Sequence, residues 1–196
     1  MFANRFIALV DACCLAGALK RNLLLTLAEA DFFRVRWSQA IHDETKRAIE
    51  DILNAKDAPD AGDRARRARN AMERAFDEAD VGDYQSMLCA CDDLPDPGDA
   101  HVLAAALKTR AAVIVTDNLK DFPANILSPL NLDARSADDF IADTIALDPG
   151  RAVAAVRKMR ERLKRPEKTA EVLLLGMEAA GLTETVDALR PHIQSL

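Results

Sequence analysis

The sequence Phe6-Ile-Ala-Leu-Val10, followed directly by Asp11, is the point from which the rest of the chain can be placed. A continuous apolar run closed by an acid is typical of a strand that is buried on both faces of a parallel sheet. A similar run, Ala111 to Val115, ends in Thr116-Asp-Asn118. Strand and helix patterns alternate between and around these runs. This order predicts an α/β fold with a parallel sheet.

Apolar spacing and breakers predict the other elements. A third strand is expected where Phe33, Val35 and Trp37 alternate with arginines, and Ser38 is expected to cap the next helix. The remaining helices are expected at 15–30, 64–78, 99–110, 151–164, 167–180 and 183–189, with a tight loop at 94–98. No strand pattern follows Asp148, so we predict a sheet-containing domain at 1–147 and an all-helical extension at 148–196.

Composition excludes several classes of protein. Of the 196 residues, 49% are apolar and only seven are glycine, which fits a globular chain with a real core. Apolar runs fall far short of the roughly 20 residues that cross a bilayer, and no secretory pattern opens the chain, so we expect a cytoplasmic protein. Cys13, Cys14, Cys89 and Cys91 lack the usual metal-ligand spacing, and we interpret them as small core residues.

The charge of the chain is unevenly distributed. A net charge of -6 argues on average against a nucleic-acid partner. Residues 64–74, however, carry five arginines against one glutamate, and residues 151–168 carry eight basic residues against two acidic ones, giving +4 and +6. Such stretches are usually solvated helix faces. The alternative is contact with a phosphate backbone, for which Arg66, Arg67 and Arg69 are the candidates.

Acids are expected to gather at one edge of the predicted sheet. Asp11 closes the first strand, Asp117 and Asp121 follow the strand at 111–115, and Asp99 begins a helix. Ligands of open parallel sheets bind beyond the carboxyl ends of the strands. Glu44 borders the apolar stripe of its helix and can lean toward the same edge. Carboxylates without Cys or His suit Mg²⁺ or Mn²⁺, which promote phosphodiester hydrolysis.

Each of these residues also has a structural interpretation. Asp99 can be a simple helix cap, Asp96 can serve turn geometry, and Glu44 can be a solvated charge. His42 and His101 lie among apolar residues of their helices, and we interpret both as hydrogen-bonded structural histidines rather than general bases. His192 is expected at the surface.

Four ordered motifs carry a resemblance to a known family. They are Val10-Asp-Ala12, the W-S-x-x-I-x-x-E pattern at 37–44, L-P-D-P-G-D-A-H-V-L-A-A-A at 94–106, and V-I-V-T-D-N-L-K-D-F-P at 113–123. Over roughly residues 5 to 145 the chain resembles PIN-domain proteins of the VapC type. The resemblance implies a three-layer α/β/α fold and a metal-dependent endoribonuclease, typically the toxin of a type II toxin–antitoxin pair. It also implies an RNA substrate, an antitoxin partner and a homodimer.

The resemblance also assigns roles to the acids. Asp11 matches the first metal ligand, Glu44 the second acid and Asp99 the third, with Asp11 and Asp99 expected to hold one Mg²⁺ or Mn²⁺ directly. The catalytic set is completed by Asp121, the favoured fourth acid. Thr116 is expected to orient a ligand or a phosphate.

Two points of the assignment stay open. Asp117 and Asn118 are alternatives for the fourth position. Where many relatives carry a further acid before the third aspartate, this chain has Gly98. Asp96 is then the only neighbouring carboxylate, and the number of metals is undecided. The other functional hypothesis is a PIN-fold module that binds RNA or protein without cutting it.

Overall fold

The computed structural model describes residues 6–164 and 167–196, and within them four strands form one sheet. The strands are β1 (Ile7–Val10), β2 (Arg34–Arg36), β3 (Val113–Val115) and β4 (Asp133–Arg135). Their order across the sheet is β2-β1-β3-β4, and every pair is parallel. Ala8 of β1 is aligned with Val35 on one side and Val113 on the other. The predicted parallel sheet is therefore confirmed.

Helices connect and cover these strands. The helices are α1 (Ala12–Ala16), α2 (Ala18–Glu29), α3 (Gln39–Asn54), α4 (Ala61–Ala75), α5 (Ala100–Thr109), α6 (Ala124–Leu127), α7 (Ala137–Leu147), α8 (Pro149–Arg162), α9 (Ala170–Ala179) and α10 (Thr183–Leu189). Short 3-10 helices lie at Asp77–Ala79, Gln85–Ala90, Pro97–Asp99, Leu119–Asp121, Ser128–Leu130 and Arg190–Ser195.

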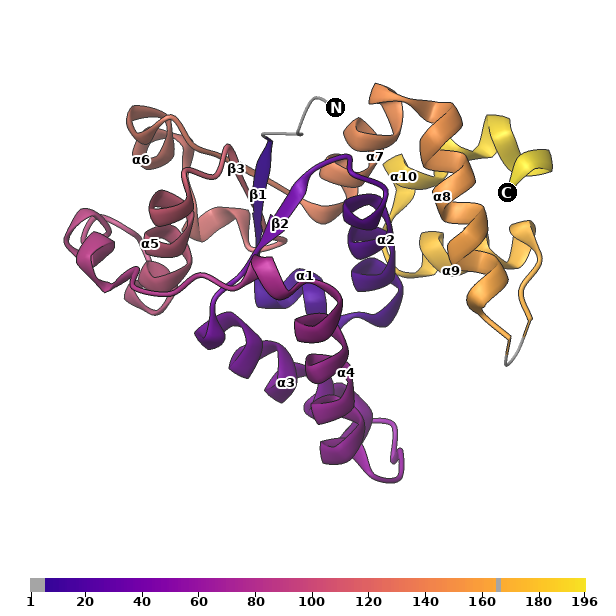
Figure 1. Ribbon diagram of the computed structural model, residues 1–196, viewed down its shortest axis with the longest axis horizontal. Coiled ribbons are helices and arrows are strands. Elements are labelled where there is room, and N and C mark those ends of the chain that lie inside the picture. Colours follow the sequence, from indigo (N-terminus) through magenta and orange to yellow (C-terminus); the bar gives the residue numbers. More distant parts are fainter. Residues whose placement is uncertain (1–5, 165–166) are drawn as a thin grey trace.

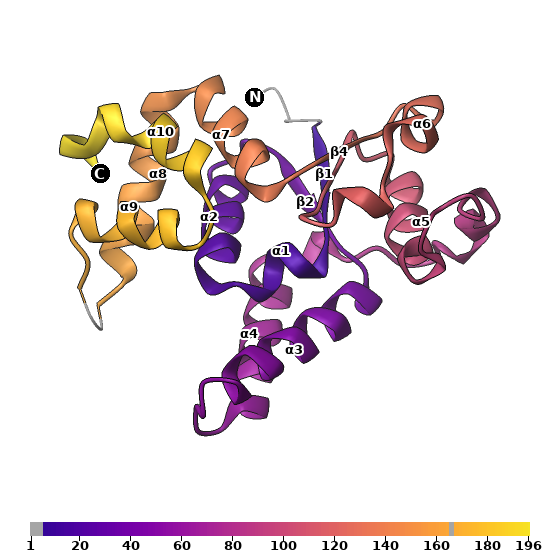
Figure 2. The ribbon, with the colours of Figure 1, turned by 180° about the vertical axis from the view of Figure 1, so that it is seen from behind.

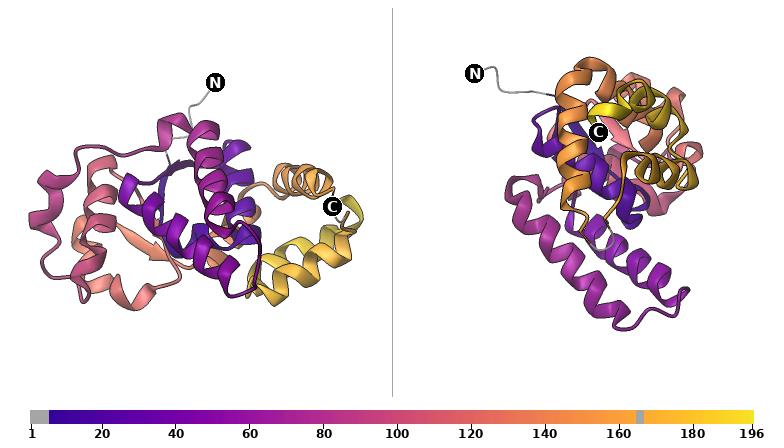
Figure 3. Two further views of the ribbon diagram at one scale, coloured as in Figure 1. Left: turned by 90° about the horizontal axis from the view of Figure 1, so that it is seen from below. Right: turned by 90° about the vertical axis from the view of Figure 1, so that its right-hand side faces the viewer.

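The helices flank the sheet in the predicted three-layer arrangement. Figure 1 shows α5 on one side of the strands and α2 with α7 on the other, and the view from behind in Figure 2 agrees. The helices α3 and α4 pack against each other as a hairpin that extends away from the sheet (Figure 3). The C-terminal helices α8, α9 and α10 lie beyond α2 and α7.

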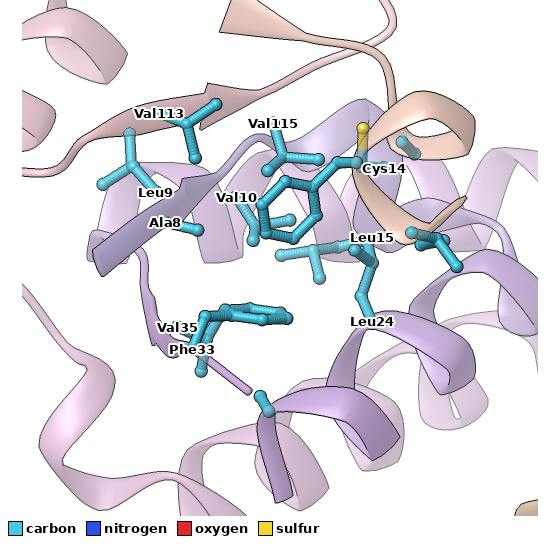
Figure 4. Close-up of a cluster of buried hydrophobic side chains, with 14 of the residues drawn as sticks. Ala8, Leu9, Val10, Cys14, Leu15, Leu24, Phe33, Val35, Val113 and Val115 are labelled. Atoms are coloured by element: carbon cyan, nitrogen blue, oxygen red, sulfur yellow. The ribbon is translucent and has the colours of Figure 1, made fainter. Parts of the chain in front are cut away.

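The two central strands form the middle of the core. In β1, Ala8, Leu9 and Val10 have no solvent exposure, and β3 is buried throughout. Figure 4 shows Val10 of β1 and Val115 of β3 beside Leu15 of α1, with Leu24 of α2 below them in the same cluster. Full burial of a valine or leucine stabilises a fold by roughly 1.5–3 kcal/mol. Residues at the ends of β1 and β3 are thus fixed on a rigid base.

Several predicted elements differ from the observed ones. The helix expected at 15–30 is two helices, because the backbone at Gly17 is extended (φ -72°, ψ 121°). The helix expected at 64–78 spans Ala61–Ala75 instead, since Phe76 leaves helical geometry. The sequence interpretation omitted β4, whose three residues include two charged ones. Of the four cysteines, Cys14 and Cys91 are buried as predicted, but Cys13 and Cys89 are exposed.

The C-terminal region is helical, as predicted. Its arrangement is tied to the preceding helix α7, because the Asp138 carboxylate accepts hydrogen bonds from the backbone N–H groups of Glu184 and Thr185 at the start of α10. Arg165 and Pro166, which the sequence interpretation used, lie outside the described residues. No helix in the described part of the chain is long and apolar enough to span a membrane.

Candidate metal centre

The topology of the sheet creates a crevice at its carboxyl edge. The chain leaves β1 toward β2 on one side, and β3 pairs with β1 on the other side, so the direction of the strand order reverses between β1 and β3. Such switch points are where open α/β sheets bind ligands. Asp11 follows β1 and Thr116 follows β3, and the Asp11 N–H donates to the Val115 carbonyl at 3.0 Å. Both residues therefore stand at the crevice.

Asp11 is buried, with only 7% of it exposed, and its carboxylate is held by several hydrogen bonds. Its Oδ1 accepts from the Ala12 backbone N–H at 2.6 Å, which caps α1. Its Oδ2 accepts from the Thr116 hydroxyl at 2.7 Å and from the Cys13 thiol at 3.2 Å. These donors are all neutral groups. They orient the carboxylate without cancelling its charge.

Three further carboxylates form the tightest group of acids in the crevice. Asp96, Asp99 and Asp121 each offer an oxygen within 4.8 Å of the others. Asp96 accepts from the Gly98 N–H at 2.8 Å, and Asp99 begins α5 without capping it through its side chain. Asp121 ends a 3-10 turn after β3 and is buried. Asp99 is thus placed among the acids, and its carboxylate is not used as a helix cap.

Asn118 connects the acids with one another. Its Nδ2 donates to an oxygen of Asp121 and, at 3.4 Å, to Oδ2 of Asp99. Its backbone N–H donates to the Thr116 hydroxyl oxygen at 3.1 Å. The Thr116 hydroxyl in turn donates to Asp11. A single neutral chain of hydrogen bonds therefore runs from Asp11 to Asp99 and Asp121.

The crowding of acids perturbs the titration of Asp99. Burial and the charges of Asp11, Asp96 and Asp121 raise the pKa of Asp99 from 3.8 to about 6, against a small opposing effect of His101. A cation close to Asp121 is Lys120, whose Nζ is 3.8 Å away and whose side chain is 81% exposed. Such an exposed pair offsets little charge. The crevice thus carries excess negative charge, which a bound cation would relieve.

Glu44, on α3, contacts His101, which lies two residues after Asp99 in α5. Its Oε1 lies 3.1 Å from Nε2 of His101, and its side chain is 36% exposed. Burial lowers the pKa of His101, but the hydrogen bond and charge of Glu44, with the charges of Asp11 and Asp99, raise it overall. His101 therefore faces acids. No sequence pattern joins Glu44 with His101, which are 57 residues apart.

His42 belongs to the core on the α3 side, as predicted, but its ring makes no hydrogen bond to the described residues. Its ring is fully buried and meets the edge of Trp37 with centroids 4.9 Å apart. Neither ring nitrogen has a hydrogen-bond partner among the described residues, and burial lowers the pKa of His42. The neutral ring therefore acts as a packing group.

Asp117 has its own partners, and it does not belong to the group of Asp96, Asp99 and Asp121. One carboxylate oxygen pairs with the Lys20 ammonium, and the other accepts from the Ala137 N–H at 3.1 Å at the start of α7. Asp117 is exposed, whereas Asp121 is buried. The geometry therefore favours Asp121 over Asp117 for the fourth acidic position.

The arginines predicted to contact RNA differ in their surroundings. Arg69, on α4, donates hydrogen bonds to Asp43 and Gln39 of α3 and to Glu73 of its own helix. Arg66 pairs with Asp63 at 2.9 Å, and both are exposed. Arg67 is exposed on α4 and has no ion-pair partner within the described ranges. Arg67 thus has the guanidinium most available to an external anion.

The fold and the crevice define an open parallel α/β protein with a group of oxygen ligands at its topological switch point. Residues 8–120 match the family model described as PIN domain, and residues 137–191 match the one described as VapC50 C-terminal domain. Since the first match covers more than half of the chain, the protein belongs to the PIN domain family.

A curated relative agrees with this assignment. Over 76 residues the chain is 42% identical to a Mycobacterium tuberculosis protein described as "Putative ribonuclease VapC50". The aligned segment covers 39% of this chain and 45% of that protein. The chain therefore spans less than half of the relative's length in this match. No solved structure matches the chain.

Proposed function

We propose that this protein is a metal-dependent endoribonuclease that hydrolyses phosphodiester bonds in RNA. The observation that carries the proposal is the crevice itself, where burial and neighbouring acids raise the pKa of Asp99 to about 6. Uncompensated carboxylates at a switch point are a poor anion site until a cation joins them. Membership of the PIN family and the ribonuclease description of the relative support the same activity.

The residues present fit Mg²⁺ or Mn²⁺. The proposed ligands are all carboxylate oxygens, which these hard ions prefer. Asp11 and Asp99 would hold the ion directly, with Asp121 and Glu44 completing the catalytic set and Asp96 within reach of Asp99. When bound, the ion supplies charge neutralisation and an acidified water for attack on phosphorus.

The chain's own residues would position these ligands. The Thr116 hydroxyl and the Ala12 N–H fix the two oxygens of Asp11, so that its carboxylate keeps one orientation. Asn118 holds Asp99 and Asp121 at a set spacing. His101 fixes Glu44 at the edge of the crevice. Partners that orient metal ligands contribute about 10–100-fold to metal affinity or activity.

The biological role follows the VapC-type resemblance. We infer that the protein is the toxin of a type II toxin–antitoxin pair, that its antitoxin covers the acidic crevice, and that the toxin forms a homodimer. Arg66, Arg67 and Arg69 would add sequence-independent affinity for the RNA backbone. The division of the chain at 147/148 stays a prediction. The contacts of α7 with α10 cross that boundary.

The test is Mn²⁺-dependent cleavage of a structured RNA. Asp11→Asn and Asp99→Asn should each reduce the rate by at least about 100-fold, because they remove metal ligands rather than the groups that orient them. Asp93→Asn, an exposed acid of the loop before Asp96, is the matched control and should cleave like the unmodified protein.

Two results would contradict the proposal. Cleavage that persists in both Asp11→Asn and Asp99→Asn would remove these residues from the mechanism. Mn²⁺ binding without any cleavage of RNA by the unmodified protein would identify a binding module instead.

A further inference from the structure

A second group of metal-ligand side chains lies at the start of α1, and the proposed ribonuclease mechanism does not use it. The Sγ atoms of Cys13 and Cys14 are 3.8 Å apart. An oxygen of Asp117 lies within 4.8 Å of both sulfurs. Cys14 is buried, whereas Cys13 and Asp117 are exposed. An ion from solvent can therefore approach the group through Cys13 and Asp117.

The spacing of the two sulfurs matches that of a tetrahedral thiolate site. With zinc–sulfur bonds of about 2.3 Å, two sulfurs on one Zn²⁺ lie about 3.8 Å apart. Cys13 and Cys14 are adjacent residues of α1, and adjacent side chains of a helix do not normally face each other, yet their sulfurs are in contact. Thiolates prefer zinc-like ions, whereas carboxylates alone suit Mg²⁺. The two groups of ligands therefore differ in the cations they select.

A cation of the chain already contacts this group. The Lys20 ammonium pairs with the Asp117 carboxylate, which extends from the loop after β3 toward α2. The side chain of Lys20 is 19% exposed. An external cation would have to displace this ammonium from Asp117. Removing Lys20 should consequently strengthen cation binding.

Cys13 links the group directly to Asp11. Its thiol donates to Oδ2 of Asp11 at 3.2 Å and lies 3.5 Å from the Thr116 hydroxyl oxygen. The Thr116 hydroxyl donates to the same Oδ2. When a cation binds, the two thiol protons leave to solvent and Asp11 loses one donor. Two protons are thus exchanged for one divalent cation, and the net charge of the group does not change. The effect on the acidic crevice is the loss of a donor that orients the Asp11 carboxylate as a metal ligand.

We propose that Cys13, Cys14 and Asp117 form a binding site for a thiophilic divalent cation of the zinc type, and that its occupation inhibits the acidic crevice. The binding stands on the sulfur and carboxylate geometry alone. The inhibition rests on the ribonuclease activity proposed above.

The binding is tested by titrating the full chain with Cd²⁺ and recording the ultraviolet charge-transfer absorption of cadmium–thiolate bonds. One saturable equivalent is expected for the unmodified protein and for the control Cys89→Ser, whose exposed thiol lies elsewhere. Cys13→Ser should weaken binding at least about tenfold, because a thiolate ligand is lost. Lys20→Ala should tighten it about fivefold, because a competing charge is removed.

Other outcomes of the titration would overturn the site. These are the absence of a saturable band, a band that saturates at the same Cd²⁺ concentration in Cys13→Ser as in the unmodified protein, or a band that disappears in Cys89→Ser. Circular dichroism of each variant verifies that the fold is retained.

The inhibition is tested by measuring Mn²⁺-dependent RNA cleavage with and without added Zn²⁺ and comparing the ratio within each variant. Zn²⁺ should suppress cleavage in the unmodified protein and in Cys89→Ser but leave the ratio near one in Cys13→Ser. Equal suppression in all three would overturn the link to Asp11. If no variant cleaves RNA, the ribonuclease proposal and the inhibition fail together, while the Cd²⁺ titration still decides whether the site exists.

Discussion

Two charged regions of the molecule contrast in how their charges are satisfied. In the crevice, Asp11, Asp99 and Asp121 are held by neutral donors, and their mutual repulsion remains. On α8, by contrast, Arg162 makes two hydrogen bonds to Glu29 of α2, at 2.8 and 3.2 Å, and Arg157 pairs with Glu161. Among the described residues, the ion pair of Asp121 with the exposed Lys120 is the only one that these three acids make, whereas both arginines pair with an acid of the chain.

The basic residues of α8 stabilise the fold, whereas we expect the acids of the crevice to bind a ligand. Arg151 of α8 lies 4.1 Å from the centre of the Phe32 ring, and Arg160 donates to the Lys168 carbonyl at 2.9 Å. Much of the positive charge on α8 therefore attaches the C-terminal helices to their surroundings. Carboxylates placed close together cost stability, and such perturbed groups cluster at functional sites. We therefore expect the function to reside in the crevice.

The largest expected effect concerns the fourth acidic position, and it would distinguish Asp121 from Asp117. Asp121→Asn should reduce RNA cleavage by about 100-fold, because Asp121 belongs to the unneutralised group. Asp117→Asn is the matched variant and should change the rate less than about threefold, since Asp117 already pairs with Lys20 and α7. A larger loss in Asp117→Asn would assign the fourth position to Asp117.

A smaller effect is expected in the pH dependence of stability. In the unfolded chain Asp99 loses its proton near 3.8, but in the folded metal-free protein it retains the proton up to about 6. The folded state therefore binds more protons between these values, and its stability falls as the pH rises through them. His101, whose folded pKa is raised above 6.5, acts in the same direction at somewhat higher pH.

The measurement is thermal or urea unfolding in chelator from pH 4 to 8. The unmodified protein should lose about 1–2 kcal/mol from Asp99, less than the full shift implies because the residue is partly exposed. Asp99→Asn should lack this loss and should be the more stable protein at pH 7.5. Mn²⁺ should then raise the melting temperature of the unmodified protein only. Identical pH profiles for the two proteins would show that the pKa of Asp99 is not raised in the folded state.

The sequence predicted the elements whose signal is local. The buried runs that became β1 and β3, and the acids that follow them, could be read because one apolar segment fixes both the strand and its carboxyl end. Asp99 could be placed because a Pro-rich loop precedes its helix. In contrast, β4 has only three residues, Asp133-Ala-Arg135, and its partner β3 supplies the pairing. A short edge strand with charged residues has no periodic pattern to recognise.

The sequence could not predict which charged side chains have partners, because those partners lie far away in the sequence. Arg162 and Glu29 are 133 residues apart, and Thr116 and Asp11 are 105 apart. The sequence therefore presented α8 as a candidate for phosphate contact, just as it did α4. Only the packing of α8 on α2 shows that several of its arginines have internal partners.

The smallest expected effect would test whether the basic residues of α4 and α8 really differ. Arg162→Ala should destabilise the protein by up to about 1 kcal/mol, because it removes the paired hydrogen bonds to Glu29 at an exposed site. The salt dependence of its RNA binding should stay unchanged.

Arg67→Ala should leave stability within about 0.5 kcal/mol, since Arg67 is exposed on α4 without an ion-pair partner among the described residues. It should lower the salt slope by about one, as expected for a lost phosphate contact. Denaturant unfolding and binding to the uncleaved RNA at several salt concentrations measure the two effects, and a reversed pattern would place the RNA on α8 instead.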